Sequence, residues 1–135
     1  MLTIISQLAI NCKDIATTEA WYTKNFGFRR ARRVELPDGR EIVFIKMADS
    51  AFYLELFKAD ADPVPEAIND GPTTAGYRHL AFKVGDVNEK LASIENADIT
   101  LGPLDFDDFI PGWRTVWIRD PDGRIIELSQ GFTDA

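Results

Sequence analysis

The feature of the sequence that most restricts its fold is an internal repeat with an offset of 72 residues. Gln7 and Glu55 lie 48 positions apart. The same spacing separates His79 from Glu127, so both members shift equally (79 − 7 = 72 and 127 − 55 = 72). So long a period predicts two modules of one domain, because solenoid repeats are shorter and more numerous. Three flanking positions are identical in the two copies: Leu8/Leu80, Ala9/Ala81 and Asp14/Asp86.

Each copy is predicted to contain a strand, a helix and three further strands. Helices are expected after Asp14 and Asp86, which are good capping residues, and the first helix is expected to end at Gly27. We expect one domain, in which the first module covers about residues 1–58, a linker 59–75, and the second module 76–135. The strands are expected at 3–12, 28–35, 41–48 and 51–58 in the first copy, and at 77–84, 98–101, 113–119 and 124–130 in the second.

Composition excludes several classes of protein. The net charge of −7 argues against a nucleic-acid partner, whose phosphates favour basic surfaces. No apolar run approaches the length of a membrane span, and the first residues lack the basic region of a secretory signal. One cysteine permits neither an internal disulfide nor a cysteine-cluster zinc site. We therefore expect a cytoplasmic protein that contacts neither membranes nor nucleic acids.

The four repeated residues are candidate metal ligands because of the strand faces that they occupy. Side chains alternate across a strand, so Gln7 and His79 lie opposite the apolar residues that pack under a helix. Glu55 and Glu127 each stand between apolar neighbours, where an unpaired buried carboxylate is costly. Two carboxylates that converge also repel each other, and a divalent cation removes that repulsion. A solvated glutamate or a hydrogen-bonded structural histidine is the ordinary alternative for any one of these residues alone.

The repeated residues and three further motifs are similar to those of a known family. The motifs are the helix end Trp21–Phe28, the segment His79–Phe82 and the closing segment Asp120–Leu128, of which the last is the most specific. On these pieces the chain resembles the vicinal oxygen chelate superfamily. This group contains glyoxalase I, bleomycin-resistance proteins, extradiol dioxygenases, fosfomycin-resistance enzymes and methylmalonyl-CoA epimerase.

The resemblance implies an α+β fold with a metal centre. Two βαβββ modules are expected to form a cupped, partly closed mixed sheet around a central cavity. The metal ligands of the family come from the first and last strands of each module, which here supply Gln7, Glu55, His79 and Glu127. This set is similar to that of one glyoxalase I branch. One imidazole and three oxygen ligands suit a single divalent ion such as Ni²⁺, Zn²⁺, Co²⁺ or Mn²⁺.

The function that this implies is that of a glyoxalase-type lyase or isomerase. The expected reaction is proton transfer next to a metal-chelated carbonyl of a small substrate, with Glu127 as the base and Glu55 as the group that returns the proton. Glutathione dependence stays open, because Asn11 and Ala59 stand where glyoxalase I has an arginine and an asparagine. Asn11 and Lys83 are candidate polar contacts for the substrate. Tyr53, Phe57 and Trp117 are expected either to line the cavity or to belong to the core.

Other interpretations of the same sequence remain. A binding or resistance protein of this fold would hold an aromatic compound such as an antibiotic without a metal. A dioxygenase or an epoxide-opening transferase is disfavoured, because those relatives use two histidines and this chain has one. The run from Arg29 to Arg33 suggests an anion site, although alternation favours a solvated edge strand. The family also implies a homodimer, with sites either within one chain or shared through exchanged modules.

Overall fold

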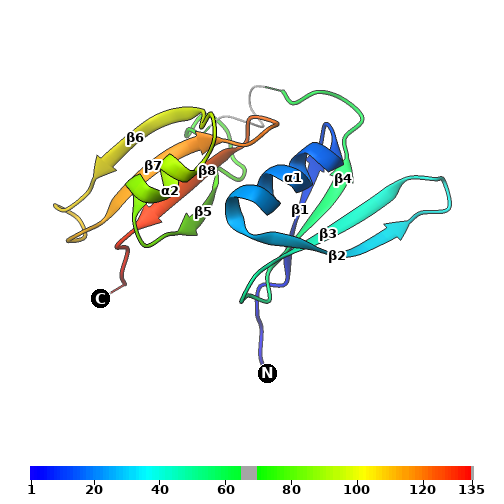
Figure 1. The fold of residues 1–135 in the computed structure, drawn as a ribbon, viewed down its shortest axis with the longest axis horizontal. Helices are drawn as coiled ribbons and strands as arrows, with labels where there is room; N and C mark the ends of the chain where they lie inside the picture. Colours follow the sequence, from blue (N-terminus) through cyan, green and yellow to red (C-terminus); the bar gives the residue numbers. More distant parts are fainter. Residues whose placement is uncertain (65–69, 135) are drawn as a thin grey trace. The chain divides into compact units, whose positions relative to one another are not determined.

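The computed structural model describes residues 1–64 and 70–134, so part of the expected linker 59–75 lies outside the described residues. The described chain divides into two compact units, residues 1–62 and 63–135, and each contains one copy of the repeat (Figure 1). Each unit has the element order strand, helix, strand, strand, strand. The expected βαβββ modules and the α+β class are therefore confirmed. Among the described residues, no helix is long and apolar enough to cross a membrane.

The first unit is a four-stranded mixed sheet with one helix. Its strand order is β1-β4-β3-β2, in which β1 and β4 run parallel and the other neighbours are antiparallel. The buried residues of β3 and β4 include Val43, Leu54 and Leu56, which alternation and the strand register place on one face of the sheet. The elements are β1 (Gln7–Cys12), α1 (Ile15–Phe26), β2 (Phe28–Glu35), β3 (Glu41–Met47) and β4 (Tyr53–Lys58).

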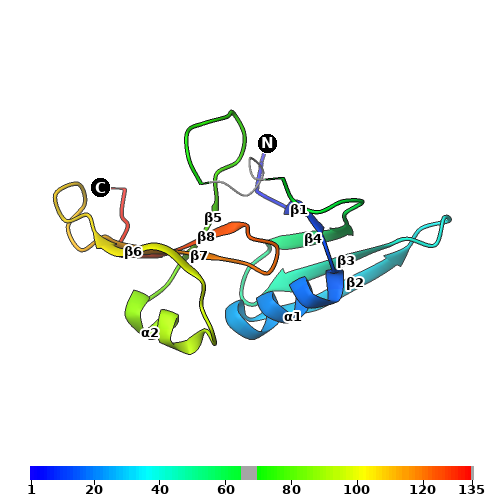
Figure 2. The same cartoon turned by 90° about the horizontal axis from the view of Figure 1, so that it is seen from above.

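Local sequence explains the limits of α1. Asp14 precedes the helix with an extended backbone, and Gly27 ends it in the left-handed conformation (φ 69°) that glycine adopts without a steric penalty. Tyr22 and Phe26 are buried on one helix face, so α1 covers one side of the sheet with aromatic side chains. The opposite side of this sheet carries no helix (Figure 2).

The second unit repeats this plan with a shorter helix. Its strand order is β5-β8-β7-β6, with β5 and β8 parallel and the other pairs antiparallel. Val87 of the helix is fully buried, together with Val116, Ile118 and Leu128 of the central strands. The elements are β5 (Leu80–Lys83), α2 (Val87–Ser93), β6 (Ile99–Asp105), β7 (Arg114–Arg119) and β8 (Ile125–Gln130).

The three largest differences from the expected strand limits arise because strand length depends on the partner. The strand expected at 3–12 starts at Gln7, which pairs with Tyr53, the first residue of β4. The strand expected at 77–84 starts at Leu80, since its ladder with β8 begins there. The short strand expected at 98–101 extends from Ile99 to Asp105 because β7 pairs with it as far as Arg114. His79 consequently lies just before its strand.

Candidate functional site

The helix-free face of the first sheet carries the first pair of candidate ligands. Leu54 and Leu56 are buried toward α1, and alternation turns Glu55 to the other face of β4. There the side-chain amide of Gln7 donates a hydrogen bond to a Glu55 carboxylate oxygen, with 3.2 Å between Nε2 and Oε2. In the strand register Ala9 lies beside Glu55. Its small side chain leaves room over the carboxylate.

The second sheet holds its pair in a more buried setting. His79 Nε2 lies 3.3 Å from Glu127 Oε1, and the other ring nitrogen, Nδ1, lies 2.7 Å from Asp70 Oδ1. The imidazole therefore stands between two carboxylates that contact its opposite nitrogens. Glu127 is only 8% exposed although it is charged in its ordinary state. Figure 2 shows the segment before β5, which leads to His79, on the side of this sheet opposite α2.

Asp70 is a functional candidate that sequence reasoning missed. It lies in the segment read as a linker, nine residues before His79 and outside the repeat. Its carboxylate also lies 3.6 Å from the guanidinium of Arg78, which helps to fix it. A histidine that donates Nδ1–H to a carboxylate presents Nε2 with its lone pair, as most metal-binding histidines do. Nothing in the strand periodicity marks this position, because the contact is made by a loop.

The environment of Glu127 makes its carboxyl group unusually basic. Burial raises the pKa of Glu127, while His79 and the Trp117 indole lower that pKa and Asp70 raises it. Burial is the largest of these effects. It acts because removal of water disfavours the charged form. Trp117 pairs with Glu127 across the β7–β8 ladder, which brings its indole beside the carboxylate.

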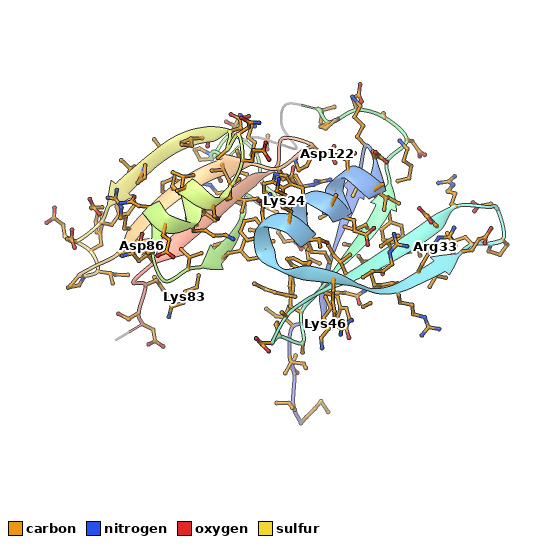
Figure 3. The ribbon with its side chains drawn as sticks, in the orientation of Figure 1. Lys24, Arg33, Lys46, Lys83, Asp86 and Asp122 are labelled. Atoms are coloured by element: carbon orange, nitrogen blue, oxygen red, sulfur yellow. The ribbon has the colours of Figure 1, made fainter. Side chains whose placement is uncertain are left out.

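The expected substrate residues are divided between the two units. Asn11 is exposed and lies beside Phe57 in the register of β1 and β4, and Tyr53 lies beside Gln7. Tyr53, Phe57 and Trp117 are half-buried on the helix-free faces, so they are not part of the core under the helices. Lys83 is exposed at the end of β5 near Asp86, the residue that begins α2 (Figure 3).

An aromatic cluster on the second sheet was also missed. Trp113 donates a hydrogen bond from Nε1 to Ser129 Oγ at 2.9 Å, and Ser129 is two residues beyond Glu127 on β8. The cluster shares a sheet face with Glu127, since residues two apart on a strand point the same way. The Phe106 ring contacts both tryptophan rings, with centroids 5.1 Å from Trp113 and 6.3 Å from Trp117. From the sequence, residues 105–109 are expected only to form a loop, because their aromatic residues have no period.

The donor atoms fit a divalent cation as two pairs. Within residues 1–64 and 70–134, no three histidine, cysteine or acidic side chains gather closely enough to hold an ion. Each unit instead presents one carboxylate with one neutral donor, an amide in the first and an imidazole in the second. A half-turn of the Gln7 amide exchanges its nitrogen for its oxygen. Nitrogen and oxygen donors of these kinds suit Mn²⁺, Co²⁺, Ni²⁺ or Zn²⁺.

Two βαβββ modules with matched side chains on helix-free faces define the glyoxalase-like α+β fold. The chain belongs to the glyoxalase/bleomycin resistance protein/dioxygenase superfamily, whose family model matches residues 4–128. A glyoxalase family protein from Enterococcus faecalis is 29% identical in sequence, with a TM-score of 0.74 over 93% of this chain and 96% of that one. The family expected from the sequence motifs is thus confirmed.

More distant structures share the fold and show the range of the superfamily. A variant of the fosfomycin resistance protein FosX from Listeria monocytogenes, complexed with Mn(II) and a dihydroxypropylphosphonic acid, has a TM-score of 0.71 at 17% identity, covering 99% of this chain and 94% of that one. The antibiotic binding protein TnmS3 from Streptomyces sp. CB03234 has a TM-score of 0.69 at 18% identity, covering 97% of this chain and 98% of that one. The same fold is therefore found in a protein complexed with Mn(II) and in an antibiotic binding protein.

Proposed function

We propose that the protein is a divalent-metal-dependent lyase or isomerase that moves a proton next to a carbonyl group of a small substrate. The observation that carries this proposal is the matched pair of donors in each module, Gln7 with Glu55 and His79 with Glu127. These four residues would hold one ion, either within one chain or across a homodimer with exchanged modules. Bound there, a divalent cation supplies Lewis-acid stabilisation of negative charge on neighbouring substrate oxygens.

The proton transfer is assigned to the two carboxylates. Glu127 takes the proton from the carbon beside the carbonyl, because its buried position next to Trp117 makes a carboxylate a better base than one in water. His79 lies beside that carboxylate, with its Nε2 3.3 Å from Glu127 Oε1. Glu55, which is more open to solvent, takes up a proton from water and gives it to the substrate, while Glu127 releases its own proton to solvent at the end of the cycle. Tyr53, Phe57 and Trp117 supply apolar walls, with Asn11 and Lys83 as polar contacts.

Metal titration of paired variants tests whether the two donor pairs serve one ion. Mn²⁺ binding is measured by electron paramagnetic resonance on wild type, Glu55→Ala and His79→Ala, with Glu35→Ala as an exposed control. A common site predicts one ion per chain in wild type and weakened binding of that ion in both site variants. If each variant retained a full-strength site in the other module, the two pairs would be independent and the proposal would fail.

Mixing of defective chains tests the shared dimer site. Glu55→Ala and His79→Ala damage different modules, so unfolding and refolding them together forms mixed dimers. If each site joins modules from two chains, about a quarter of the sites regain all four residues. Sites formed within one chain regain none. Recovery of activity therefore assigns the exchanged arrangement, and no recovery assigns the single-chain one.

A second candidate function is the sequestration of an aromatic compound. It is favoured by the aromatic cluster beside Glu127, in which Phe109 is 76% exposed and Phe132 49% exposed. Both rings contact the cluster, Phe109 through Phe106 and Phe132 through Trp113. The fold is shared with an antibiotic binding protein, TnmS3. Tight binding of aromatic ligands to metal-free protein, with no turnover in any metal-loaded sample, would favour this function over the enzyme.

A further inference from the structure

The edge strand β2 divides its four arginines between the two faces of the first sheet. Arg30 is paired with Ile45 of β3, a buried residue on the helix side, and its guanidinium binds Glu19 of α1 at 2.6 and 2.8 Å. Arg33 is paired with Val43, also on the helix side, and forms an ion pair with Glu41. These two arginines are therefore already neutralised by neighbouring carboxylates.

A β-bulge turns the other two arginines toward the opposite face. The register shifts between Arg30 and Arg32, which leaves Ala31 as an extra residue on β2. In a regular strand, residues three apart such as Arg29 and Arg32 would point in opposite directions. Because of the bulge, Arg29 lies beside Lys46 and Arg32 beside Phe44. Directly paired residues share a face.

This face is the one that carries the candidate ligands Gln7 and Glu55. Phe44 lies between Arg32 and Glu55 in the strand register, so one continuous row crosses three strands. Neighbouring strands are about 4.8 Å apart, which places the Arg32 backbone about 10 Å from that of Glu55. A second row runs from Arg29 through Lys46 and Tyr53 to Gln7. Both rows lead from a cationic edge to the proposed metal ligands.

The cations on this face have no partners among the described residues. No hydrogen bond or ion pair to residues 1–64 or 70–134 involves the side chain of Arg29, Arg32 or Lys46, whereas Arg30 and Arg33 are both paired. Arg29 and Arg32 are exposed and Lys46 is half-buried. Figure 3 shows Lys46 near one end of the β2–β3 hairpin and Arg33 farther toward its turn. Three cations without a partner in the described part of the chain are notable in a protein whose net charge is −7.

We infer that Arg29, Arg32 and Lys46 form an anion-binding subsite for a carboxylate, phosphate or phosphonate group of the ligand. Guanidinium groups bind such oxyanions through paired, charge-assisted hydrogen bonds. The apolar floor is Phe44, and the distance to Glu55 suits a small molecule with its anionic group at one end and its reactive carbonyl at the other. The inference rests on the proposed function only in taking this ligand to be the substrate.

Anion binding to metal-free protein tests the subsite separately from catalysis. Arginine Nε–H signals are followed by nuclear magnetic resonance during titration with inorganic phosphate, with pyruvate, and with the uncharged ketone hydroxyacetone. We expect saturable shifts for Arg29 and Arg32 with one or both anions and none with hydroxyacetone. A preference for phosphate assigns a phosphate or phosphonate group, and a preference for pyruvate assigns a carboxylate.

Variants that each remove one arginine charge show which arginines bind the anion. Arg29→Gln and Arg32→Gln should each weaken anion binding about tenfold, as expected for loss of a charged hydrogen bond. Arg33→Gln removes the same charge from the same strand on the other face and should leave binding unchanged. Equal weakening by Arg33→Gln, or no saturable shift with either anion, would overturn the subsite. Because no metal is present, that result would leave the proposed metal-dependent function standing, and loss of Mn²⁺ binding alone would leave the subsite standing.

Discussion

The two modules share a topology but surround their matched residue pairs differently. In the first, the Gln7–Glu55 contact is open to solvent and joins two flexible polar side chains. In the second, Glu127 is buried and His79 is held between two carboxylates. The matched positions of the repeat therefore hold a solvent-exposed pair in the first module. In the second module they hold a buried carboxylate and an imidazole that contacts two carboxylates. Under the proposed function, the comparison therefore predicts that the second module does most of the acid–base work.

The outer strands show a second contrast. The edge strand β2 is rich in arginine, whereas the corresponding edge strand β6 exposes Ile99, Leu101 and Leu104 at 46%, 53% and 38%. The central strands of both sheets are far more alike, because their buried faces must pack against a helix. Edge strands contribute less to the core and can diverge. The chemistry that distinguishes the two modules is therefore concentrated at their edges and loops.

Among the variants that test this difference between the modules, substitution of Glu127, the proposed base, should have the largest effect on activity. Glu127→Gln is expected to lower the rate of proton exchange by about 10²- to 10⁴-fold, the usual contribution of a general base. The amide keeps the shape of the side chain, so the fold should persist. Deuterium wash-out next to the carbonyl is measured with any compound turned over in a screen of α-keto and 2-hydroxy carbonyl compounds. Glu89→Gln, at an exposed helix position, is the control. An unimpaired Glu127→Gln variant would remove that residue from the role of base.

Replacement of His79 and replacement of Gln7 should weaken metal affinity by different amounts. His79→Ala is expected to weaken Mn²⁺ binding more than about 100-fold, beyond the usual cost of losing an outer partner. Gln7→Ala should cost less, because an amide oxygen is a weaker ligand than an imidazole. Calorimetric titration of both variants measures the difference. Equal losses would mean that the second module does not dominate the site, and unchanged affinity in His79→Ala would contradict its role as a ligand.

Loss of the loop carboxylate should have an intermediate effect. Asp70→Asn is expected to weaken metal affinity by about 10- to 100-fold, since it removes the acceptor that fixes the His79 ring. The ¹⁵N shifts of the His79 ring report the balance of its two tautomers, which a merely structural role for Asp70 would not change. Asp108→Asn is the control, because Asp108 is an exposed residue of the same unit. If the tautomer balance and the affinity both stay at wild-type values, Asp70 is not a positioning residue.

The sequence predicted those parts of the fold that depend on short-range patterns. Alternation placed Leu54 and Leu56 toward the helix and Glu55 away from it, as observed. Gly27 marked the end of the first helix correctly, because few other residues adopt its left-handed conformation without strain. The repeat and the closing motif identified the family, which the family model confirms over residues 4–128.

The missed features depend on contacts between distant segments. Asp70 reaches His79 from an irregular loop, and no period in the sequence records that approach. The bulge at Ala31 has no sequence signal of its own, yet it reverses the face of every following residue on β2. Alternation places arginines on both faces, as observed, but the bulge decides that Arg29 shares a face with Arg32 and not with Arg33. The predicted common metal centre stays a prediction, for which the two observed donor pairs are the support.

The helix caps give the smallest expected difference between the modules. Asp86 accepts a hydrogen bond from the Glu89 backbone N–H at 2.9 Å, whereas Asp14 makes no such cap and instead accepts from the Thr17 hydroxyl at 2.6 Å. Asp86→Ala should therefore lower the free energy of unfolding by about 1 kcal/mol, and Asp14→Ala by less.

Urea unfolding at several pH values measures both effects. The Thr17 hydrogen bond lowers the pKa of Asp14, so the folded state favours its ionised form. Any stability that Asp14 contributes is thus present above its ordinary pKa and disappears as the pH falls through the lowered value. The Asp14→Ala difference should shrink in acid, because wild type then loses the same interaction. An Asp14→Ala cost equal to that of Asp86→Ala at neutral pH would show that the two helix starts are energetically equivalent despite their different hydrogen bonds.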